Sequence, residues 1–144
     1  MNTAYKITAI PEVLDYDEKT IYKDGSFYFG YKRNGKRHGL GLYLWPEGYG
    51  FYGEWRDGEL IKGKGIDRDR NVYEGEWKDG KGNGYGKMTY LDGSVYDGEW
   101  MDGKENGLGY IIKSGKKSHV LYLKVKDRVE CITLCLSELP KTKG

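Results

Sequence analysis

The residue types that usually carry out catalysis or bind metals are scarce in this sequence. Among its 144 residues are two histidines, His38 and His119, and two cysteines, Cys131 and Cys135. The cysteines lack the Cys-x-x-Cys spacing and the second ligand pair of a structural zinc site. We therefore expect both histidines to be solvated surface residues and both cysteines to be small buried apolar residues. The sequence predicts no metal site and no cofactor.

Carboxylates are plentiful, but a catalytic pair would have to converge in a pocket that separates their pKa values. Glu54 and Glu76 lie in short strand-like segments, where pairing with Lys or Arg across strands is the more common arrangement. Asp67, Asp69 and Asn71 match the start of a calcium-binding loop, but the glycine and the distal glutamate of that loop are missing. No catalytic residue is predicted, and we do not expect an enzyme.

The dominant feature of the sequence is a five-residue motif of aromatic residues around a glycine, which starts at residues 28, 51, 73 and 96. Its four copies are Tyr28-Phe29-Gly30-Tyr31-Lys32, Phe51-Tyr52-Gly53-Glu54-Trp55, Tyr73-Glu74-Gly75-Glu76-Trp77 and Tyr96-Asp97-Gly98-Glu99-Trp100. Each copy is followed by an Asn-Gly or Asp-Gly pair and then by a Gly-x-Gly segment, in which one residue separates two glycines. Self-similarity at a short, fixed period indicates a stacked array, in which each unit buries its apolar face against its neighbours.

The third copy shows how one unit forms strands. Alternation along a strand places Tyr73, Gly75 and Trp77 on one face and Glu74 and Glu76 on the other. Glycine normally weakens a strand, so Gly75 needs a structural reason. Because Gly75 has no Cβ, a ring from the adjacent strand could lie against its backbone.

Turn residues separate the strands of each unit. Asp79-Gly80 suits a tight hairpin turn because both residues tolerate positive φ, and Leu91-Asp92-Gly93 predicts a second reversal. Two strands and two turns then fill the period. A helix is excluded because each unit contains at least four glycines, each of which would cost ~0.8–1 kcal/mol in a helix interior.

These offsets resemble the MORN (membrane occupation and recognition nexus) repeat over about residues 26–115. The resemblance implies an all-β fold: an elongated, single-layer antiparallel sheet of consecutive β-hairpin repeats with degenerate capping ends. The predicted segments are an N-terminal hairpin or cap (1–25), four repeats (26–48, 49–71, 72–93 and 94–115), and a C-terminal cap with a basic tail (116–144).

Both ends and the second repeat depart from the pattern. The N-terminal cap is predicted as a hairpin that turns at Asp17-Glu18-Lys19. In the C-terminal cap, Val120–Asp127 and Val129–Leu136 are predicted as paired strands, with a short helix over residues 129–139 as the alternative, because short apolar runs are ambiguous. The second repeat has one extra residue in its turn, Glu59-Leu60-Ile61-Lys62, before Gly63-Lys64-Gly65.

Charge and hydropathy narrow the range of partners. The 24 basic and 22 acidic residues nearly balance, and no concentrated basic stripe of the kind that binds nucleic acid is present. No apolar run reaches the ~20 residues of a transmembrane helix, and the N-terminus lacks the basic and apolar segments of a signal peptide. We expect a cytoplasmic protein, which could be peripheral to a membrane or to the cytoskeleton.

The remaining candidates for function are surface residues. The aromatic columns are largely structural, but a single-layer sheet covers only one face with its own rings, so some rings should be exposed as partner anchors. These columns are Tyr28, Phe51, Tyr73, Tyr96, Trp55, Trp77 and Trp100. A basic turn, Lys32, Arg33, Lys36 and Arg37, could attract anionic phospholipid.

The sequence therefore predicts a non-enzymatic scaffold or adaptor that binds a protein or peptide partner along one face of the sheet. The resemblance suggests two alternatives. One is a module recruited to phosphoinositides or other anionic membrane lipids. The other is a regulatory repeat segment related to those attached to lipid-kinase or methyltransferase domains.

Overall fold

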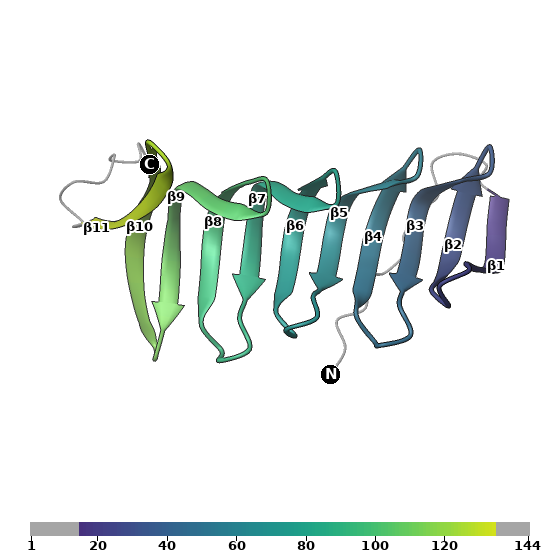
Figure 1. Ribbon diagram of the computed structural model, residues 1–144, viewed down its shortest axis with the longest axis horizontal. Helices are drawn as coiled ribbons and strands as arrows, with labels where there is room; N and C mark the ends of the chain where they lie inside the picture. The colour runs from purple at the N-terminus through teal and green to yellow at the C-terminus, as the bar shows by residue number, and fades with distance from the viewer. Residues whose placement is uncertain (1–14, 135–144) are drawn as a thin grey trace, which may run out of the picture.

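The computed structural model describes residues 15–134, which form one antiparallel sheet of eleven strands lying side by side in chain order (Figure 1). The strands are β1 (Asp15–Ile21), β2 (Phe27–Arg33), β3 (Lys36–Leu44), β4 (Gly50–Arg56), β5 (Glu59–Ile66), β6 (Val72–Lys78), β7 (Lys81–Thr89), β8 (Val95–Met101), β9 (Lys104–Lys113), β10 (Lys116–Val125) and β11 (Arg128–Leu134). The described residues contain no helix. Because strands pair only with their neighbours in the sequence, the sheet is one elongated layer, and the predicted fold is confirmed.

Two kinds of turn alternate along the chain and lie on opposite long edges of the sheet (Figure 1). On one edge, Asp79 and Gly80 have φ values of 51° and 76°, as in the tight type I′ hairpin turn. On the other edge, the backbone N–H of Tyr90 donates to the carbonyl oxygen of Ser94 at 2.9 Å, and the Asp92 carboxylate accepts from the N–H of Ser94. Both turns form where the sequence predicts them.

A row of glycines crosses the sheet from β2 to β9, and each glycine lies opposite the next. The row consists of Gly30, Gly41, Gly53, Gly63, Gly75, Gly86, Gly98 and Gly109. A Cβ added to Gly75 would lie 2.5 Å from the Cα of Gly86, whereas non-bonded carbons approach to about 3.5 Å. The two backbones can be this close only because neither residue has a side chain.

The prediction that a ring from the adjacent strand lies against Gly75 is wrong. Gly75 faces the backbone of the adjacent strand, which leaves no space for a ring. A Cβ added to Gly86 would lie 2.2 Å from the hydroxyl oxygen of Tyr73, so the Tyr73 ring rests on this glycine. The same contact recurs between Tyr28 and Gly41 and between Tyr96 and Gly109.

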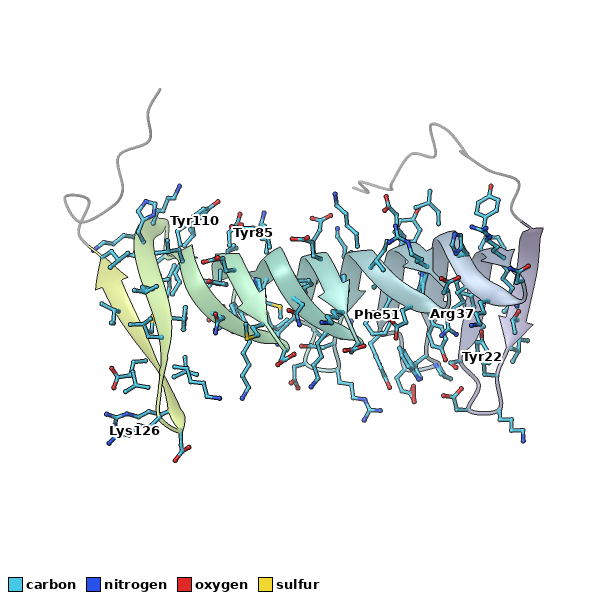
Figure 2. All side chains as sticks on the ribbon, turned by 90° about the horizontal axis from the view of Figure 1, so that it is seen from above. Tyr22, Arg37, Phe51, Tyr85, Tyr110 and Lys126 are labelled. Atoms are coloured by element: carbon cyan, nitrogen blue, oxygen red, sulfur yellow. The ribbon has the colours of Figure 1, made fainter. Side chains whose placement is uncertain are left out.

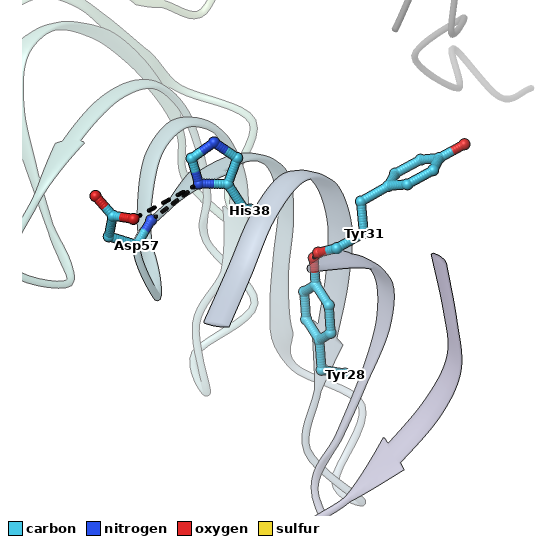
Figure 3. Close-up of polar contacts among 4 residues, drawn as sticks. All are labelled: Tyr28, Tyr31, His38 and Asp57. Atoms are coloured by element: carbon cyan, nitrogen blue, oxygen red, sulfur yellow. Dashed lines mark hydrogen bonds and ion pairs between the residues drawn. The ribbon is translucent and has the colours of Figure 1, made fainter. Parts of the chain in front are cut away.

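The polar atoms of the rings are hydrogen-bonded in a repeated pattern. The Tyr73 hydroxyl donates to the carbonyl oxygen of Glu76 at 2.8 Å, and Figure 3 shows the equivalent bond from Tyr28 to the carbonyl oxygen of Tyr31. The indole N–H groups of Trp55, Trp77 and Trp100 donate to the carbonyl oxygens of Gly41, Gly63 and Gly86. Each tryptophan is thereby bonded to a glycine of the preceding hairpin.

The two ends of the sheet differ from each other. The predicted turn at Asp17–Lys19 is not formed, because β1 continues through these residues and places Glu18 and Lys19 opposite Phe29 in a bulge of β1 against β2. At the C-terminal end, β10 and β11 pair as a hairpin. The predicted pairing of Val120–Asp127 with Val129–Leu136 is therefore confirmed as far as Leu134, and residues 135–139 of the alternative helix lie outside the described part of the chain.

Two residues assigned from the sequence have different surroundings. Cys131 is exposed rather than buried, because β11 is an edge strand; Cys135 lies outside the described residues. The side chain of His38 is only 12% exposed. Its Nδ1 accepts a hydrogen bond from the N–H of Asp57 at 3.3 Å and lies 3.8 Å from the Asp57 carboxylate (Figure 3). His38 thus joins two hairpin turns and is not a solvated turn residue.

Candidate binding groove

The two faces of the sheet carry different side chains. Tyr22, Arg37 and Phe51 project to one face, here called the ring face, whereas Tyr85 and Tyr110 project to the opposite face (Figure 2). On the opposite face, charged residues of alternating sign lie directly across from one another between β5 and β8. These residues are Lys64, Glu74, Lys87 and Asp97. The ring face holds most of the buried apolar surface.

Aromatic contacts run along the ring face from β3 to β10. Phe51 and Trp77 have ring centroids 5.2 Å apart, and Tyr73 and Trp100 have centroids 5.1 Å apart. Both pairs are edge-to-face, the arrangement that the ring quadrupole favours. The series of contacts follows the order Tyr43, Trp45, Phe51, Trp77, Tyr73, Trp100, Tyr96 and Tyr122.

The buried core beneath these rings is nevertheless divided in two. One cluster contains Tyr28, Trp55 and Leu60, and the other contains Tyr73, Tyr96, Trp100 and Val120. Trp77 is half-buried and packs against both clusters. The core is therefore incomplete at β4 to β6, in the middle of the sheet.

Two adjoining hollows open where the core is incomplete. The larger, of about 330 Å³, is walled by Trp45, Phe51, Trp77, Met88 and Trp100 and reaches Arg68 and Lys81 at its rim. The smaller, of about 250 Å³, shares Trp45, Phe51 and Trp77 with the first and extends to Arg37. Together they form a groove lined by rings, which we call the central groove.

The glycine row explains why the hollow lies in the second repeat. The register places Gly63 opposite Gly53 and Gly75, so Gly63 is the equivalent of Gly41 and Gly86. The alignment of Gly63-Lys64-Gly65 with the Gly-x-Gly segments of the other repeats, made from the sequence, is therefore wrong. From Gly58 to Gly63 the chain is one residue shorter than between the equivalent glycines, Gly80 and Gly86, and the second repeat lacks a residue rather than having one extra.

This one-residue difference removes two large side chains from the ring face. Gly65 stands where Tyr43 and Met88 stand in the neighbouring hairpins, and it lies opposite Tyr73. A Cβ at Gly65 would be 2.5 Å from the Trp77 indole. Two residues further on, Asp67 occupies the turn position held elsewhere by Tyr22, Trp45 and Tyr90. The missing side chains leave the larger hollow empty.

Polar groups from two turns on one edge of the sheet, between β3 and β4 and between β5 and β6, lie at the rim of the larger hollow. The Arg68 guanidinium donates to the Tyr49 hydroxyl at 2.8 Å and lies 5.0 Å from the centre of its ring; the hydrogen bond and charge of Tyr49 raise the pKa of Arg68. The Asp67 carboxylate accepts bonds from the N–H groups of Asp69 and Asn71 and from the Asn71 amide. Asp67 therefore closes its own turn.

Five of the seven predicted anchor rings are buried: Tyr28, Trp55, Tyr73, Tyr96 and Trp100 are at most 6% exposed. Phe51 and Trp77 are half-buried and line the central groove. The prediction did not include Trp45, Tyr43 and Tyr49, which also line it. The sequence does contain a signal for Trp45. It lies one repeat period after Tyr22, and Tyr90 lies three periods after Tyr22; each of these aromatic residues comes just before a turn.

The predicted basic cluster does not present four equivalent charges. The register pairs Lys32 with Arg37 and Arg33 with Lys36, but Arg37 turns into the ring face. Its guanidinium donates to the carbonyl oxygen of Gly58 at 2.9 Å and to the Tyr22 hydroxyl at 3.1 Å. It also lies 5.1 Å from the Trp55 ring centre. Lys32 donates to the Thr20 hydroxyl, so Arg33 and Lys36 are the two members that are exposed.

The central groove can supply apolar contact and cationic rim charges. In residues 15–134, every buried side-chain nitrogen or oxygen has a hydrogen-bond partner, and no three His, Cys, Asp or Glu side chains are placed to hold a metal ion. Nor do these residues contain a helix long and apolar enough to cross a membrane.

An open, single-layer sheet of hairpins with a glycine row and stacked rings defines a β-hairpin repeat protein. The MORN repeat model matches residues 28–48, 73–95 and 96–113, so MORN repeats are present in the chain. The unmatched stretch between residues 49 and 72 contains the shortened repeat and much of the central groove.

The sequence is also similar to alsin from Rattus norvegicus, Mus musculus and Homo sapiens. Each is 34% identical over 85 residues, an alignment that covers 51% of this chain and 5% of the relative. The chain thus spans about one-twentieth of the length of these relatives. Their similarity supports the repeat assignment and does not extend to a whole-protein activity.

Proposed function

We propose that this chain is a non-enzymatic scaffold or adaptor module that binds a protein or peptide partner along its ring face. The observation that carries the proposal is the interruption of the buried core at β4 to β6, where Trp45, Phe51 and Trp77 line a groove and remain half-buried. Large rings in a partly dehydrated groove are the usual anchors of protein interfaces.

The proposal is tested by capturing partners from the native source with the full chain and matched variants. Trp45→Ala removes a groove ring, and Tyr85→Ala removes a ring that is 67% exposed on the opposite face. Partners should be lost with Trp45→Ala and retained with Tyr85→Ala, as measured by mass spectrometry. Thermal unfolding of both variants checks that they fold. Equal retention by the two variants would contradict binding at the ring face.

Anionic lipid is the competing outcome of the same experiment. Changing Lys32, Arg33 and Lys36 to Ser should leave partner capture intact, because these residues lie outside the central groove. Arg37 is kept because it is part of the ring packing. Tight binding to anionic liposomes that the Ser variant or raised salt abolishes would favour membrane recruitment instead, since surface charges are screened within about 8–10 Å.

A further inference from the structure

The larger hollow of the central groove has the dimensions of a pocket for one side chain. Its volume of about 330 Å³ lies at the lower end of ligand pockets, which range from about 300 to 1,000 Å³. Its walls are Trp45, Phe51, Trp77, Met88 and Trp100, and its base includes Gly65 and Gly82. Such a surface suits a large apolar side chain, and the equivalent positions in the neighbouring hairpins are filled by this chain's own large side chains, among them Tyr43 and Met88.

The rim of the same hollow is cationic at both ends. Arg68 comes from the turn between β5 and β6 and Lys81 from the start of β7, so the two charges stand on opposite long edges of the sheet. Neither forms an ion pair with a carboxylate of residues 15–134. Asp67, the acidic residue of the lining, already accepts three hydrogen bonds from its own turn. Glu47 lies outside the lining, and its charge helps to raise the pKa of Arg68 without forming an ion pair with it. The rim is therefore complementary to carboxylates of a partner.

Resting on the proposed function, we propose that the hollow at the shortened second repeat is a specificity pocket for an acidic peptide segment that inserts one large apolar side chain, tryptophan or one of similar size. The inserted side chain occupies the space that Gly65 and Asp67 leave open. Carboxylates on either side of it pair with Arg68 and Lys81. The shortened repeat thereby selects the partner, while the regular repeats on either side hold the sheet rigid.

The direct test uses a fluorescein-labelled acidic peptide with a central tryptophan flanked on both sides by glutamates, and a matched peptide with alanine at the centre. Fluorescence anisotropy measures their affinity for the full chain at low ionic strength. The tryptophan peptide should bind at least about tenfold more tightly, because burying the indole removes far more apolar surface from water than burying the alanine methyl group. Equal affinity for the two peptides would overturn the proposal, as would undetectable binding of the tryptophan peptide.

Charge-reversal variants place the contact at this hollow. Lys81→Glu and Arg68→Glu should each weaken binding of the tryptophan peptide by about five- to tenfold. Lys104→Glu is the matched control, because Lys104 follows Asp102-Gly103 as Lys81 follows Asp79-Gly80 but does not line the hollow. It should change the affinity less than about twofold. An equal effect of Lys81→Glu and Lys104→Glu would show non-specific attraction and refute the pocket.

Two further outcomes separate this inference from the proposed function. If native partners are lost with Trp45→Ala but the tryptophan and alanine peptides bind alike, the ring face binds a partner and the specificity pocket is refuted. If phosphatidylserine vesicles displace the tryptophan peptide and Lys81→Glu abolishes vesicle binding, the rim recognises lipid headgroups, and the peptide proposal is overturned.

Discussion

Gly86 lies where the Tyr73 ring meets the neighbouring strand, and an added Cβ there would come within 2.2 Å of the tyrosine hydroxyl oxygen. The ring is 4% exposed and is held on its other side by Trp100, so it has little freedom to move away. At the scale of single residues, the small size of such glycines allows the large rings to pack on a one-layer sheet. Side-chain volume, not charge, is the limiting property.

Substitution of this glycine should destabilise the sheet. We expect Gly86→Ala to lower the free energy of unfolding by about 1–3 kcal/mol or more, as overpacking of a close-packed site does. The measurement is chemical denaturation of the full chain. Gly80→Asn is the control, since a Cβ at Gly80 meets nothing within 4 Å and asparagine tolerates positive φ; it should cost less than about 1 kcal/mol. If the two variants lost the same free energy of unfolding, the Tyr73 ring would be able to move away from residue 86 at little cost.

At the scale of elements, a bulge distinguishes the regular hairpins from the shortened one. Between Gly75 and Trp77, a single residue of β6 faces three residues of β7, and Gly84 within that bulge has a φ of 97°. The Glu76 carboxylate accepts a hydrogen bond from the N–H of Tyr85 at 2.6 Å and so closes the bulge. The β8–β9 hairpin repeats this arrangement with Glu99 and Leu108. Bulges of this kind bend a strand and increase its twist.

Loss of the carboxylate that closes the bulge should therefore weaken its hairpin. We expect Glu76→Ala to lower the free energy of unfolding by about 1 kcal/mol, a typical net value for one hydrogen bond. Glu54→Ala is the matched comparison, because Glu54 holds the same position in the second repeat, where the bulge is shorter. It should cost a few tenths of a kcal/mol at most. If denaturation curves of the two variants coincide, the carboxylate does not stabilise the bulge.

At the scale of the whole molecule, the ring contacts join each hairpin to the next one along the chain. Each strand pairs only with its neighbours, so the sheet depends on nearest-neighbour contacts, as repeat arrays do. Burial of tyrosines in and beside the Tyr73–Tyr96 core cluster has an electrostatic consequence. Desolvation raises the pKa values of Tyr73, Tyr90 and Tyr96 to about 12, with further contributions from Glu76 beside Tyr73 and from Glu105 beside Tyr90 and Tyr96.

These raised pKa values predict alkaline unfolding of the array. An unfolded tyrosine ionises near pH 10, whereas the folded rings keep their protons to about pH 12. Between these values the folded state binds more protons, so its stability is full below pH 10 and falls as the pH rises to about 12. For Tyr73 and Tyr96 the loss should approach about 2 kcal/mol each. Thermal unfolding and tyrosinate absorbance measured from about pH 9 to 12 check this, and ionisation near pH 10 without loss of stability would refute it.

Much of the fold could be predicted because its determinants are local. Asp79-Gly80 favours a tight turn by its own φ preferences, and the alternation around Tyr73 and Trp77 defines a strand and its apolar face. With two strands in each period of 22 or 23 residues, a stacked antiparallel sheet follows. The C-terminal hairpin could also be predicted from alternation that persists after the glycines and rings are lost.

The candidate site could be predicted only in part, because it depends on register. From the sequence, Gly63-Lys64-Gly65 has the same spacing as the other glycine doublets, and only the pairing of Gly63 with Gly53 and Gly75 shows that it is displaced by one residue. A shift of one residue would move every following side chain to the other face of the sheet. The shorter bulge of the β4–β5 hairpin absorbs that shift, so the residues after Gly63 keep their faces. Strand pairing therefore decides which rings are buried and where the central groove opens. It is a tertiary property that local residue preferences do not determine.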